Sequence, residues 1–258
     1  MNNRVQLFDI RFDAIDMNQA VSTLLGWIRS GGRQCHYVVT PNVDHVVKLE
    51  LDARFRKSYQ DASMVVADGK PVVMASRLFG KPLPAVVPGS DLVPGLFDRA
   101  WETGRPVTVF LFGAGPGVAD RAAQKIAERW GDDVNVVGTH CPEVGFDTDP
   151  VESMRLARMI AATNPDILIL GLGAPKQELW INQYREYVNA GVALCVGATI
   201  DFLAGERKRA PGVLRRLALD WAYRIYQEPK RLAGRYAHDA VVFPRLVVKE
   251  YLSMKARH

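Results

Sequence analysis

The amino-acid sequence predicts an α/β fold in which helices cover both faces of a parallel β-sheet. Short apolar runs rich in β-branched residues alternate with segments of about ten residues that carry apolar side chains at helical spacing. Glycine-rich or polar turns follow these runs, as in sheets whose ligands bind beyond the carboxyl ends of the strands. With 258 residues, 48% of them hydrophobic, the chain can form a substantial core. These observations favour a Rossmann-like sheet.

The first half of the chain contains the less regular predicted elements. Residues 5–12 alternate between polar and apolar, and residues 15–28 have helical spacing up to Gly31-Gly32. Strands are predicted over residues 35–39 and 64–67, helices over residues 43–59, 71–78 and 92–101, and a Pro- and Gly-rich loop over residues 80–94. Within residues 43–59, the spacing by four of Asp44, Lys48, Asp52 and Arg56 predicts one solvated helix face.

The second half alternates more regularly. Strands are predicted over residues 107–112, 134–137, 166–171 and 192–196, and helices over residues 118–130, 151–162 and 178–188, with a glycine turn at 113–117 and a polar loop at 143–150. Residues 166–178 stand out because an apolar strand ends in glycines, and Pro175, Lys176 and Gln177 open the next helix. Pro175 suits the first helical position. The free N–H groups and positive end of such a helix favour a phosphate.

Polar residues and glycine turns follow most of the predicted strands. They are Thr40 and Asn42, Asp68, the turn at Gly113, the turn at Gly171, and Asp201 after Gly197. Each alone is more often a turn or a helix cap than a ligand contact. Because the carboxyl ends of parallel strands lie at one edge of a sheet, we expect these residues to converge on a binding site.

Common nucleotide and metal motifs fit the sequence poorly. Gly113 and Gly115 begin a GxGxxG pattern, but Val118 occupies the third glycine position, so a dinucleotide oxidoreductase is weakly supported. A GxxxxGK[ST] phosphate loop is absent. Asp147 and Asp149 form a DxD pair typical of metal-dependent sugar transferases, although a helix cap before Pro150 is the favoured interpretation. Cys35, Cys141 and Cys195 lack metal-ligand spacing and are expected to be thiols, with Cys35 and Cys195 buried in strand-like runs.

The positive charge is concentrated in the last part of the chain. Residues 206–258 carry 13 Lys and Arg against 5 Asp and Glu, whereas residues 1–205 carry 20 against 23. Such a basic segment suits nucleic acid, an anionic membrane or a phosphorylated substrate. The sequence lacks an apolar window near the roughly 18 residues of a membrane span, and residues 1–9 lack a signal-peptide core, so we expect a cytoplasmic protein.

Motifs along most of the chain, from about residue 35 to about residue 235, resemble those of the WecG/TagA/CpsF glycosyltransferases. They are Thr40-Pro41-Asn42, Ala67-Asp68-Gly69, Pro88-Gly89-Ser90-Asp91-Leu92, the turn at 112–117, the segment 171–178 with its PKQE sequence, Gly197 to Asp201, Ala204-Gly205 and Arg209-Ala210-Pro211. The resemblance implies an inverting transferase that needs neither metal nor cofactor. Its substrates would be a UDP-sugar and a polyprenyl-diphosphate-linked saccharide at the cytoplasmic membrane face, in cell-envelope or exopolysaccharide synthesis.

The resemblance also implies roles for single residues. Asp68 matches the family's proposed catalytic base, Thr40 and Asn42 match residues beside the sugar, and Gln177 matches one in the donor pocket. The expected donor-binding residues are Gly113, Gly115, Pro116, Gly117, Gly171, Gly173, Pro175, Lys176, Glu178 and Asp201. Family members often carry an arginine near the position of Val86, and Arg77 is a hypothetical substitute for it.

The basic C-terminal segment completes the prediction. We expect a catalytic domain over residues 1–205 and a membrane-associating helical appendage over residues 206–258. Its candidate acceptor- or membrane-binding residues are Arg209, Arg215, Arg216, Arg224, Arg231 and Arg235. A nucleic-acid-binding protein is the alternative, weakened because the aromatic residues alternate with leucines and known nucleic-acid motifs are missing. The resemblance allows a homo-oligomer and leaves the sugar open among glucose, N-acetylmannosamine and its uronic acid, with a lean towards exopolysaccharide glucosyltransferases.

Overall fold

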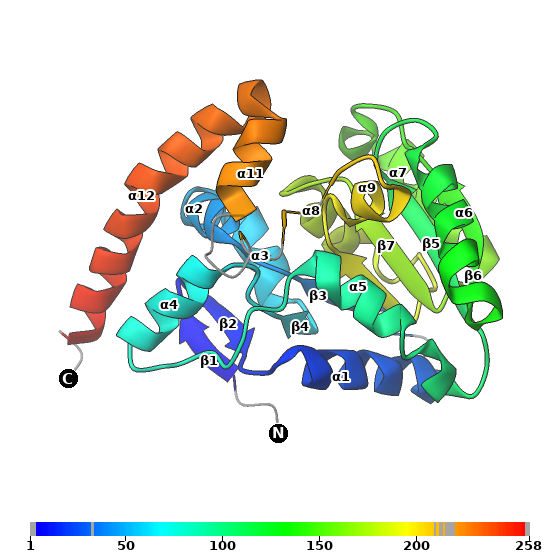
Figure 1. Ribbon diagram of the computed structural model, residues 1–258, viewed down its shortest axis with the longest axis horizontal. Helices are drawn as coiled ribbons and strands as arrows, with labels where there is room; N and C mark the ends of the chain where they lie inside the picture. Colours follow the sequence, from blue (N-terminus) through cyan, green and yellow to red (C-terminus); the bar gives the residue numbers. More distant parts are fainter. Residues whose placement is uncertain (1–3, 32–33, 209, 212–213, 215–219, 256–258) are drawn as a thin grey trace.

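A six-stranded parallel sheet forms the centre of the molecule, as the sequence predicts (Figure 1). The computed structural model describes residues 4–31, 34–208, 210–211, 214 and 220–255. The strand order is β4-β3-β8-β7-β5-β6, with β3 at His36–Val39, β4 at Met64–Val65, β5 at Val107–Gly113, β6 at Val134–His140, β7 at Ile167–Gly171 and β8 at Val192–Cys195. Each strand overlaps a predicted apolar run, because strands covered on both faces bury consecutive side chains.

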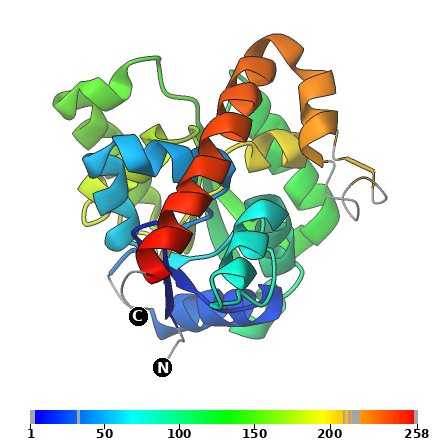
Figure 2. The same ribbon diagram turned by 90° about the vertical axis from the view of Figure 1, so that its left-hand side faces the viewer.

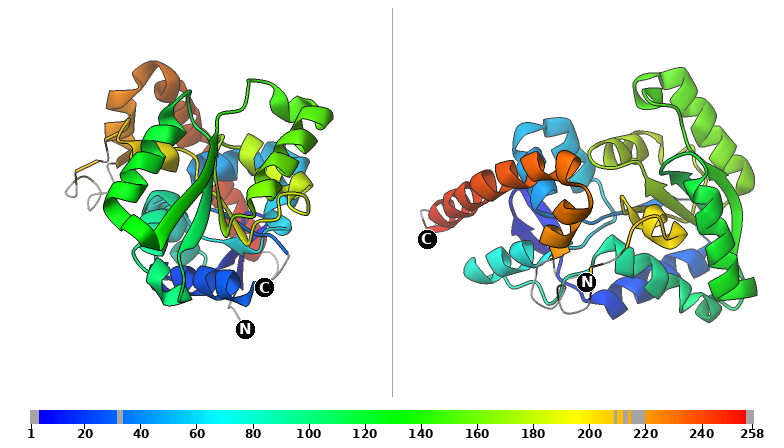
Figure 3. Two further views of the ribbon diagram at one scale, coloured as in Figure 1. Left: turned by 90° about the vertical axis from the view of Figure 1, so that its right-hand side faces the viewer. Right: turned by 45° about the horizontal axis from the view of Figure 1, so that its top comes forward.

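Helices cover both faces of the sheet, which confirms the predicted Rossmann-like arrangement (Figure 3). One face packs against α1 (Met17–Ser30), α5 (Gly89–Phe97), α6 (Val118–Trp130) and α9 (Thr199–Ala204). The other packs against α2 (Val43–Leu51), α3 (Ala53–Gln60), α4 (Lys70–Leu78), α7 (Pro150–Thr163) and α8 (Lys176–Tyr184). In β7, Ile167 and Ile169 point into the first core while Leu168 and Leu170 point into the second, as the period-two alternation of a strand requires.

An antiparallel hairpin covers the β4 edge of the sheet. The alternating residues 5–12 form β1 (Arg4–Leu7) and β2 (Ile10–Asp13), joined by Phe8 and Asp9, which both have positive φ. The buried Asp13 carboxylate accepts hydrogen bonds from Arg4 Nε at 3.0 Å and from the backbone N–H of Val65 at 2.9 Å. This carboxylate therefore ties the hairpin to the edge strand.

Two helix predictions are wrong in their bounds. Residues 43–59 form two helices, because the Asp52 carboxylate accepts from the N–H groups of Arg54 and Phe55 and starts α3. Helix α5 begins at Gly89, inside the predicted loop, and a short 3₁₀ helix (Ala100–Thr103) follows it. A Cβ atom at Gly89 would lie 2.6 Å from Val196 Cγ1, so this glycine serves close packing against the end of β8.

The described part of the C-terminal segment is helical. Helix α11 (Asp220–Gln227) leads into the 27-residue α12 (Pro229–Lys255), which lies across α2 (Figure 2). Phe243, Leu246, Val247, Tyr251 and Met254 of α12 pack against the core on that face, and Lys249 pairs with Glu50. Among the described helices, even α12 lacks the continuous apolar stretch that a membrane span requires. The segment is therefore attached to the α/β body by a packed apolar face.

Candidate functional site

The strand order of the sheet reverses between β5 and β7: from β5 the chain adds strands towards one edge, and from β7 it adds them towards the other. The connection after β5 leads outward to β6 through α6, and the one after β7 leads to β8 through α8, on the opposite face. Gly113 and Gly171 end these two strands and are paired in register. A Cβ atom at Gly113, whose φ is 115°, would lie 2.7 Å from the carbonyl carbon and oxygen of Gly171. Only glycine permits this approach, which opens the crevice where such sheets bind ligands.

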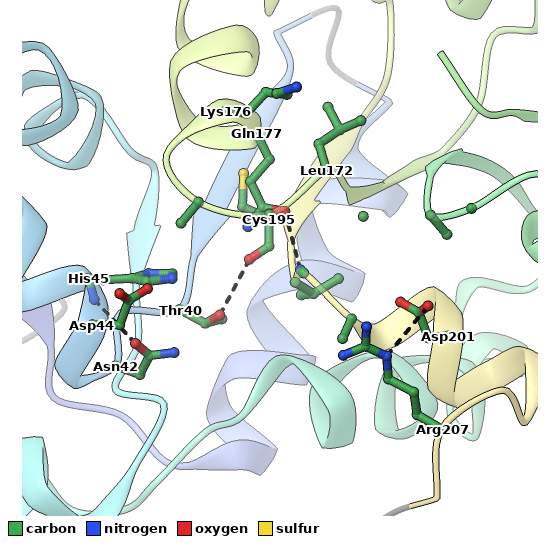
Figure 4. A pocket seen from close by; sticks show the side chains of 18 of the residues that line it. Thr40, Asn42, Asp44, His45, Leu172, Lys176, Gln177, Cys195, Asp201 and Arg207 are labelled. Atoms are coloured by element: carbon green, nitrogen blue, oxygen red, sulfur yellow. Dashed lines mark hydrogen bonds and ion pairs between the residues drawn. The ribbon is translucent and has the colours of Figure 1, made fainter. Parts of the chain in front are cut away.

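A pocket of about 490 Å³ lies at this end of the sheet (Figure 4). All six strands contribute residues that follow their carboxyl ends, among them Thr40 after β3, Asp68 after β4 and Gly197 after β8. The volume suits a small-molecule ligand. The predicted site residues that line it are Thr40, Asn42, Asp68, Gly115, Gly171, Gly173, Lys176, Gln177, Asp201, Arg224 and Arg235.

The remaining predicted residues lie elsewhere. Gly113, Pro116, Gly117, Pro175 and Glu178 do not line the described pocket and instead form the turns and the buried layer behind it. Pro175 precedes the first helical residue of α8 and follows a cis peptide bond, so it is not at the first helical position. Arg77 is exposed on α4 and does not line the pocket, because the opposite face of that helix is the buried one. Arg209, Arg215, Arg216 and the side chain of Arg231 lie outside the described residues.

One wall of the pocket comes from the ends of β3 and β4. The backbone N–H of Asp68 donates to the carbonyl oxygen of Pro41 at 2.9 Å, which holds Asp68 beside the turn that carries Thr40 and Asn42. The Thr40 hydroxyl donates to the carbonyl oxygen of Cys195 at 3.3 Å, and the Asn42 side chain caps α2. The fold thus fixes both side chains in the wall of the pocket to which Asp68 also belongs.

Three further lining residues, Asp44, His45 and Arg207, were not among the sequence-predicted site residues. Asp44 is 8% exposed, and its carboxylate pairs with Lys48 Nζ at 2.8 Å and with Arg235 Nη1 at 3.7 Å. The prediction of a solvated face is therefore wrong for Asp44. The spacing by four is consistent with the ion pair between Asp44 and Lys48, but it does not indicate which other residues face that side of α2.

His45 and Arg207 occupy opposite sides of the pocket. Burial lowers the pKa of His45 to about 4, so its ring is neutral at physiological pH, and Nδ1 lies 2.7 Å from the Tyr59 hydroxyl. Arg207 pairs with Asp201 Oδ1 at 3.6 Å and with Glu228 Oε1 at 2.7 Å. Arg207 therefore connects α9 to the junction between α11 and α12.

The N-terminus of α8 forms a second wall of the pocket. Lys176 Nζ lies 3.1 Å from Asp147 Oδ1 and over the ring of Phe146. The Gln177 side chain is 1% exposed; its Oε1 accepts from the N–H of Gly197 at 3.2 Å, and its Nε2 donates to Glu178 Oε1 at 2.8 Å. Glu178 has no exposed surface, and burial raises its pKa to about 7. Glu178 therefore reaches the pocket only through Gln177.

The DxD pair contributes to the fold. The Asp149 carboxylate accepts from the N–H groups of Val151 and Glu152, which confirms it as the cap of α7, and Asp147 pairs with Lys176. Among the residues that the structure describes, no group of three or more His, Cys, Asp or Glu side chains is placed to hold a metal ion. Cys35 and Cys195 are buried, as predicted, and Cys141 is partly exposed.

The pocket combines the chemistry of an acid–base site with that of an anion site. The Asp68 carboxylate lies on one side, and Lys176 and the arginines Arg207, Arg224 and Arg235 contribute positive charge elsewhere in the lining. The N-terminus of the nine-residue α8 adds partial positive charge at Gly173 and Lys176. A ligand with two linked phosphates and a reacting hydroxyl group would be complementary to this arrangement.

Comparison with known proteins agrees with this chemistry. A sequence profile described as the "Glycosyl transferase WecG/TagA/CpsF family" matches residues 5–257. A protein of Bacillus spizizenii is 32% identical over 76% of this chain and 72% of its own length, and one of Staphylococcus aureus is 28% identical over 89% of this chain and 87% of its own length. Both are named N-acetylglucosaminyldiphosphoundecaprenol N-acetyl-beta-D-mannosaminyltransferase.

Proposed function

Because the chain belongs to the WecG/TagA/CpsF family of glycosyl transferases, we propose that it transfers a hexose from a UDP-sugar to a polyprenyl-diphosphate-linked saccharide. The observation that carries the proposal is that the Asp68 carboxylate and the N-terminus of α8 line the same pocket. A hydroxyl acceptor and a diphosphate leaving group need these two kinds of group on opposite sides of the reacting carbon.

The proposed reaction inverts the configuration at the sugar C1. Asp68 accepts the proton of the acceptor hydroxyl while the oxygen forms a bond to C1, and the bond from C1 to the UDP oxygen breaks with its electron pair leaving on the diphosphate. We propose Thr40 and Asn42, which line the same pocket as Asp68, as contacts of the sugar. General-base help of this kind contributes about 10²- to 10⁴-fold to the rate.

Positive charge on the opposite side would stabilise the departing UDP without a metal ion. Lys176 at the start of α8 lines the pocket, and Arg207, Arg224 and Arg235 reach it from the C-terminal region. Asp201 lies next to Arg207 and is the candidate contact for the uracil or ribose. The arginines in the pocket favour a phosphorylated small substrate over the alternative function of binding nucleic acid along an outer surface.

The names of the relatives guide the choice of substrates. They imply N-acetylmannosamine as the transferred sugar and an N-acetylglucosaminyl-diphospholipid as the acceptor, and we propose both as the first candidates, with glucose as the second sugar. A lipid-linked acceptor supports our proposal that the reaction takes place at the cytoplasmic membrane face. Trp221 is 46% and Tyr226 83% exposed on α11, and aromatic side chains with nearby arginines suit a membrane interface.

The test combines a substrate screen with one substitution. UDP-N-acetylmannosamine and UDP-glucose are offered with a short-chain N-acetylglucosaminyl-diphospholipid, and transfer is measured with added chelator. Asp68→Asn is expected to lower kcat about 10²-fold or more while calorimetry still detects UDP binding. The control is Asp132→Asn, which neutralises an exposed carboxylate distant from the pocket. Wild-type turnover by Asp68→Asn would refute the role of Asp68 as the base. If neither UDP-sugar gives transfer, the proposed substrates are refuted.

A further inference from the structure

The carboxamide of Gln177 is held on both sides. Its oxygen accepts from the N–H of Gly197 at 3.2 Å, and its nitrogen donates to the Glu178 carboxylate at 2.8 Å (Figure 4 shows Gln177 in the pocket). A backbone N–H can only donate, so the end of the amide that faces Gly197 carries the oxygen. The end that faces Glu178 therefore carries the nitrogen, and the Glu178 carboxyl can accept from it whether it is ionised or protonated.

The amide nitrogen retains a hydrogen for a ligand. Nε2 carries two N–H bonds, and Glu178 Oε1 accepts one of them. Gln177 lines the pocket but is only 1% exposed, so its side chain has little freedom to turn. The second N–H is thus a preset donor at the edge of the pocket, on the side where α8 begins.

The Glu178 carboxyl that accepts from Gln177 is itself buried. The side chain is 0% exposed, and its Oε2 lacks a hydrogen-bond partner among the described residues. A buried carboxyl with one unsatisfied oxygen destabilises a fold, so its presence calls for an explanation other than stability. The side chain from which it accepts a hydrogen bond is that of Gln177, which points to that residue as the reason for its presence.

We propose that Glu178 is a positioning residue that orients the Gln177 carboxamide and so presents one amide N–H to the bound donor. The inference rests on the proposed transferase function and assigns Glu178 no direct contact with the substrate. The oriented N–H is available to the sugar or the diphosphate of the donor, where a preset donor needs no reorganisation during the reaction.

The test is a double-substitution cycle in the full-length protein. Gln177→Ala removes the amide, Glu178→Leu removes its acceptor at similar volume, and Glu178→Gln keeps an Oε1 acceptor. Glu186→Gln is the control, because Glu186 is exposed just beyond the end of α8. The readouts are kcat and KM for transfer from the UDP-sugar, with UDP binding and circular dichroism to verify folding.

Each single substitution is expected to lower kcat/KM, and the two effects are not expected to multiply in the double variant. Gln177→Ala and Glu178→Leu are each expected to lower kcat/KM about 100-fold, the double variant by a similar factor, and Glu178→Gln by less than about 5-fold. Glu178→Leu with wild-type kcat/KM, or losses that multiply in the double variant, would overturn the inference. If Glu178→Leu does not fold, a folded Glu178→Gln that loses about 100-fold would overturn it instead, and its retained activity would support it.

The two proposals fail in different ways. Absence of transfer by the unchanged protein would overturn the transferase function and the role of Glu178 with it. Normal transfer by the unchanged protein, together with multiplying losses in the variants, would overturn only the role of Glu178.

Discussion

Substituting Glu178 by glutamine changes how the stability of the protein depends on pH. Burial raises the pKa of the folded carboxyl to about 7, from an ordinary value of 4.5. The folded protein therefore binds more protons than the unfolded chain between these pH values, and its stability falls as pH rises through this window. Since each pH unit corresponds to about 1.4 kcal/mol, ionising Glu178 costs the folded state about 3 kcal/mol by pH 8. The glutamine variant has no such loss.

The surroundings of Glu178 set the size of this effect. Burial is the largest cause of the raised pKa; the hydrogen bond from Gln177 and the Lys48 ammonium act against it, and Asp44 adds to it. Tyr37, Tyr59 and Cys195 also interact with Glu178, and burial raises the pKa of each well above its ordinary value, so they stay protonated in the measured range. Of Glu178 and these three groups, Glu178 is therefore the one expected to titrate between pH 5 and 8.

The assay is urea unfolding of both proteins at pH 5, 6, 7 and 8. The free energy of unfolding of Glu178→Gln is expected to rise by about 2–3 kcal/mol relative to the unchanged protein between pH 5 and 8, because a part of the loss in the unchanged protein already occurs below pH 5. For a chain of this length that difference corresponds to about 5–10 °C in Tm. A difference in the free energy of unfolding that is the same at every pH does not affect the prediction, which concerns only how that difference changes with pH. Curves that stay parallel from pH 5 to 8 would refute the reasoning.

Three further substitutions test other parts of the structure. Gly113→Ala places a Cβ against backbone atoms at positive φ and is expected to lower the free energy of unfolding by about 3 kcal/mol or more. Its control is Gly104→Ala, where φ is also positive but the space is open, and the expected loss is about 1 kcal/mol. Equal urea midpoints for the two variants would contradict this prediction. Lys176→Ala is expected to weaken UDP binding about 10-fold by calorimetry, and Lys57→Ala, with a 62% exposed side chain outside the pocket, to leave it unchanged. Asp149→Ala removes the cap of α7 and is expected to cost about 1 kcal/mol in urea unfolding, with a loss under about 0.3 kcal/mol counting against it.

The sheet was predictable because its strands are buried on both faces. Runs such as Ile167 to Leu170 are apolar throughout, and their length and β-branched residues distinguish them from helices. The hairpin was harder to predict, because its turn places Phe8 and Asp9 at positive φ where Asn-Gly is the usual signal. The start of α5 was missed because Gly89 resembles a loop residue in a Pro- and Gly-rich stretch, while its actual requirement is the contact with Val196.

The part of the site at the strand ends was predictable for a related reason. Parallel strands bring their carboxyl ends to one edge, so Thr40, Asp68 and Gly173 converge whatever the exact strand order. Residues on helices were not predictable in the same way. Helical spacing places Asp44 beside Lys48 and puts Arg77 on the side of α4 away from its buried residues, but only tertiary packing decides that Asp44 lines a pocket and that Arg77 faces solvent.

The pocket draws its lining from nearly the whole length of the chain. Thr40 follows the first strand of the sheet, whereas Arg224 and Arg235 lie in the two C-terminal helices. During translation, the ribosome therefore makes the turns at the strand ends well before these arginines. A growing chain that has reached Ala204 contains all six strand sequences but lacks these two arginines. On the proposed function, the pocket is thus completed late in synthesis, when the last two helices can pack onto the body.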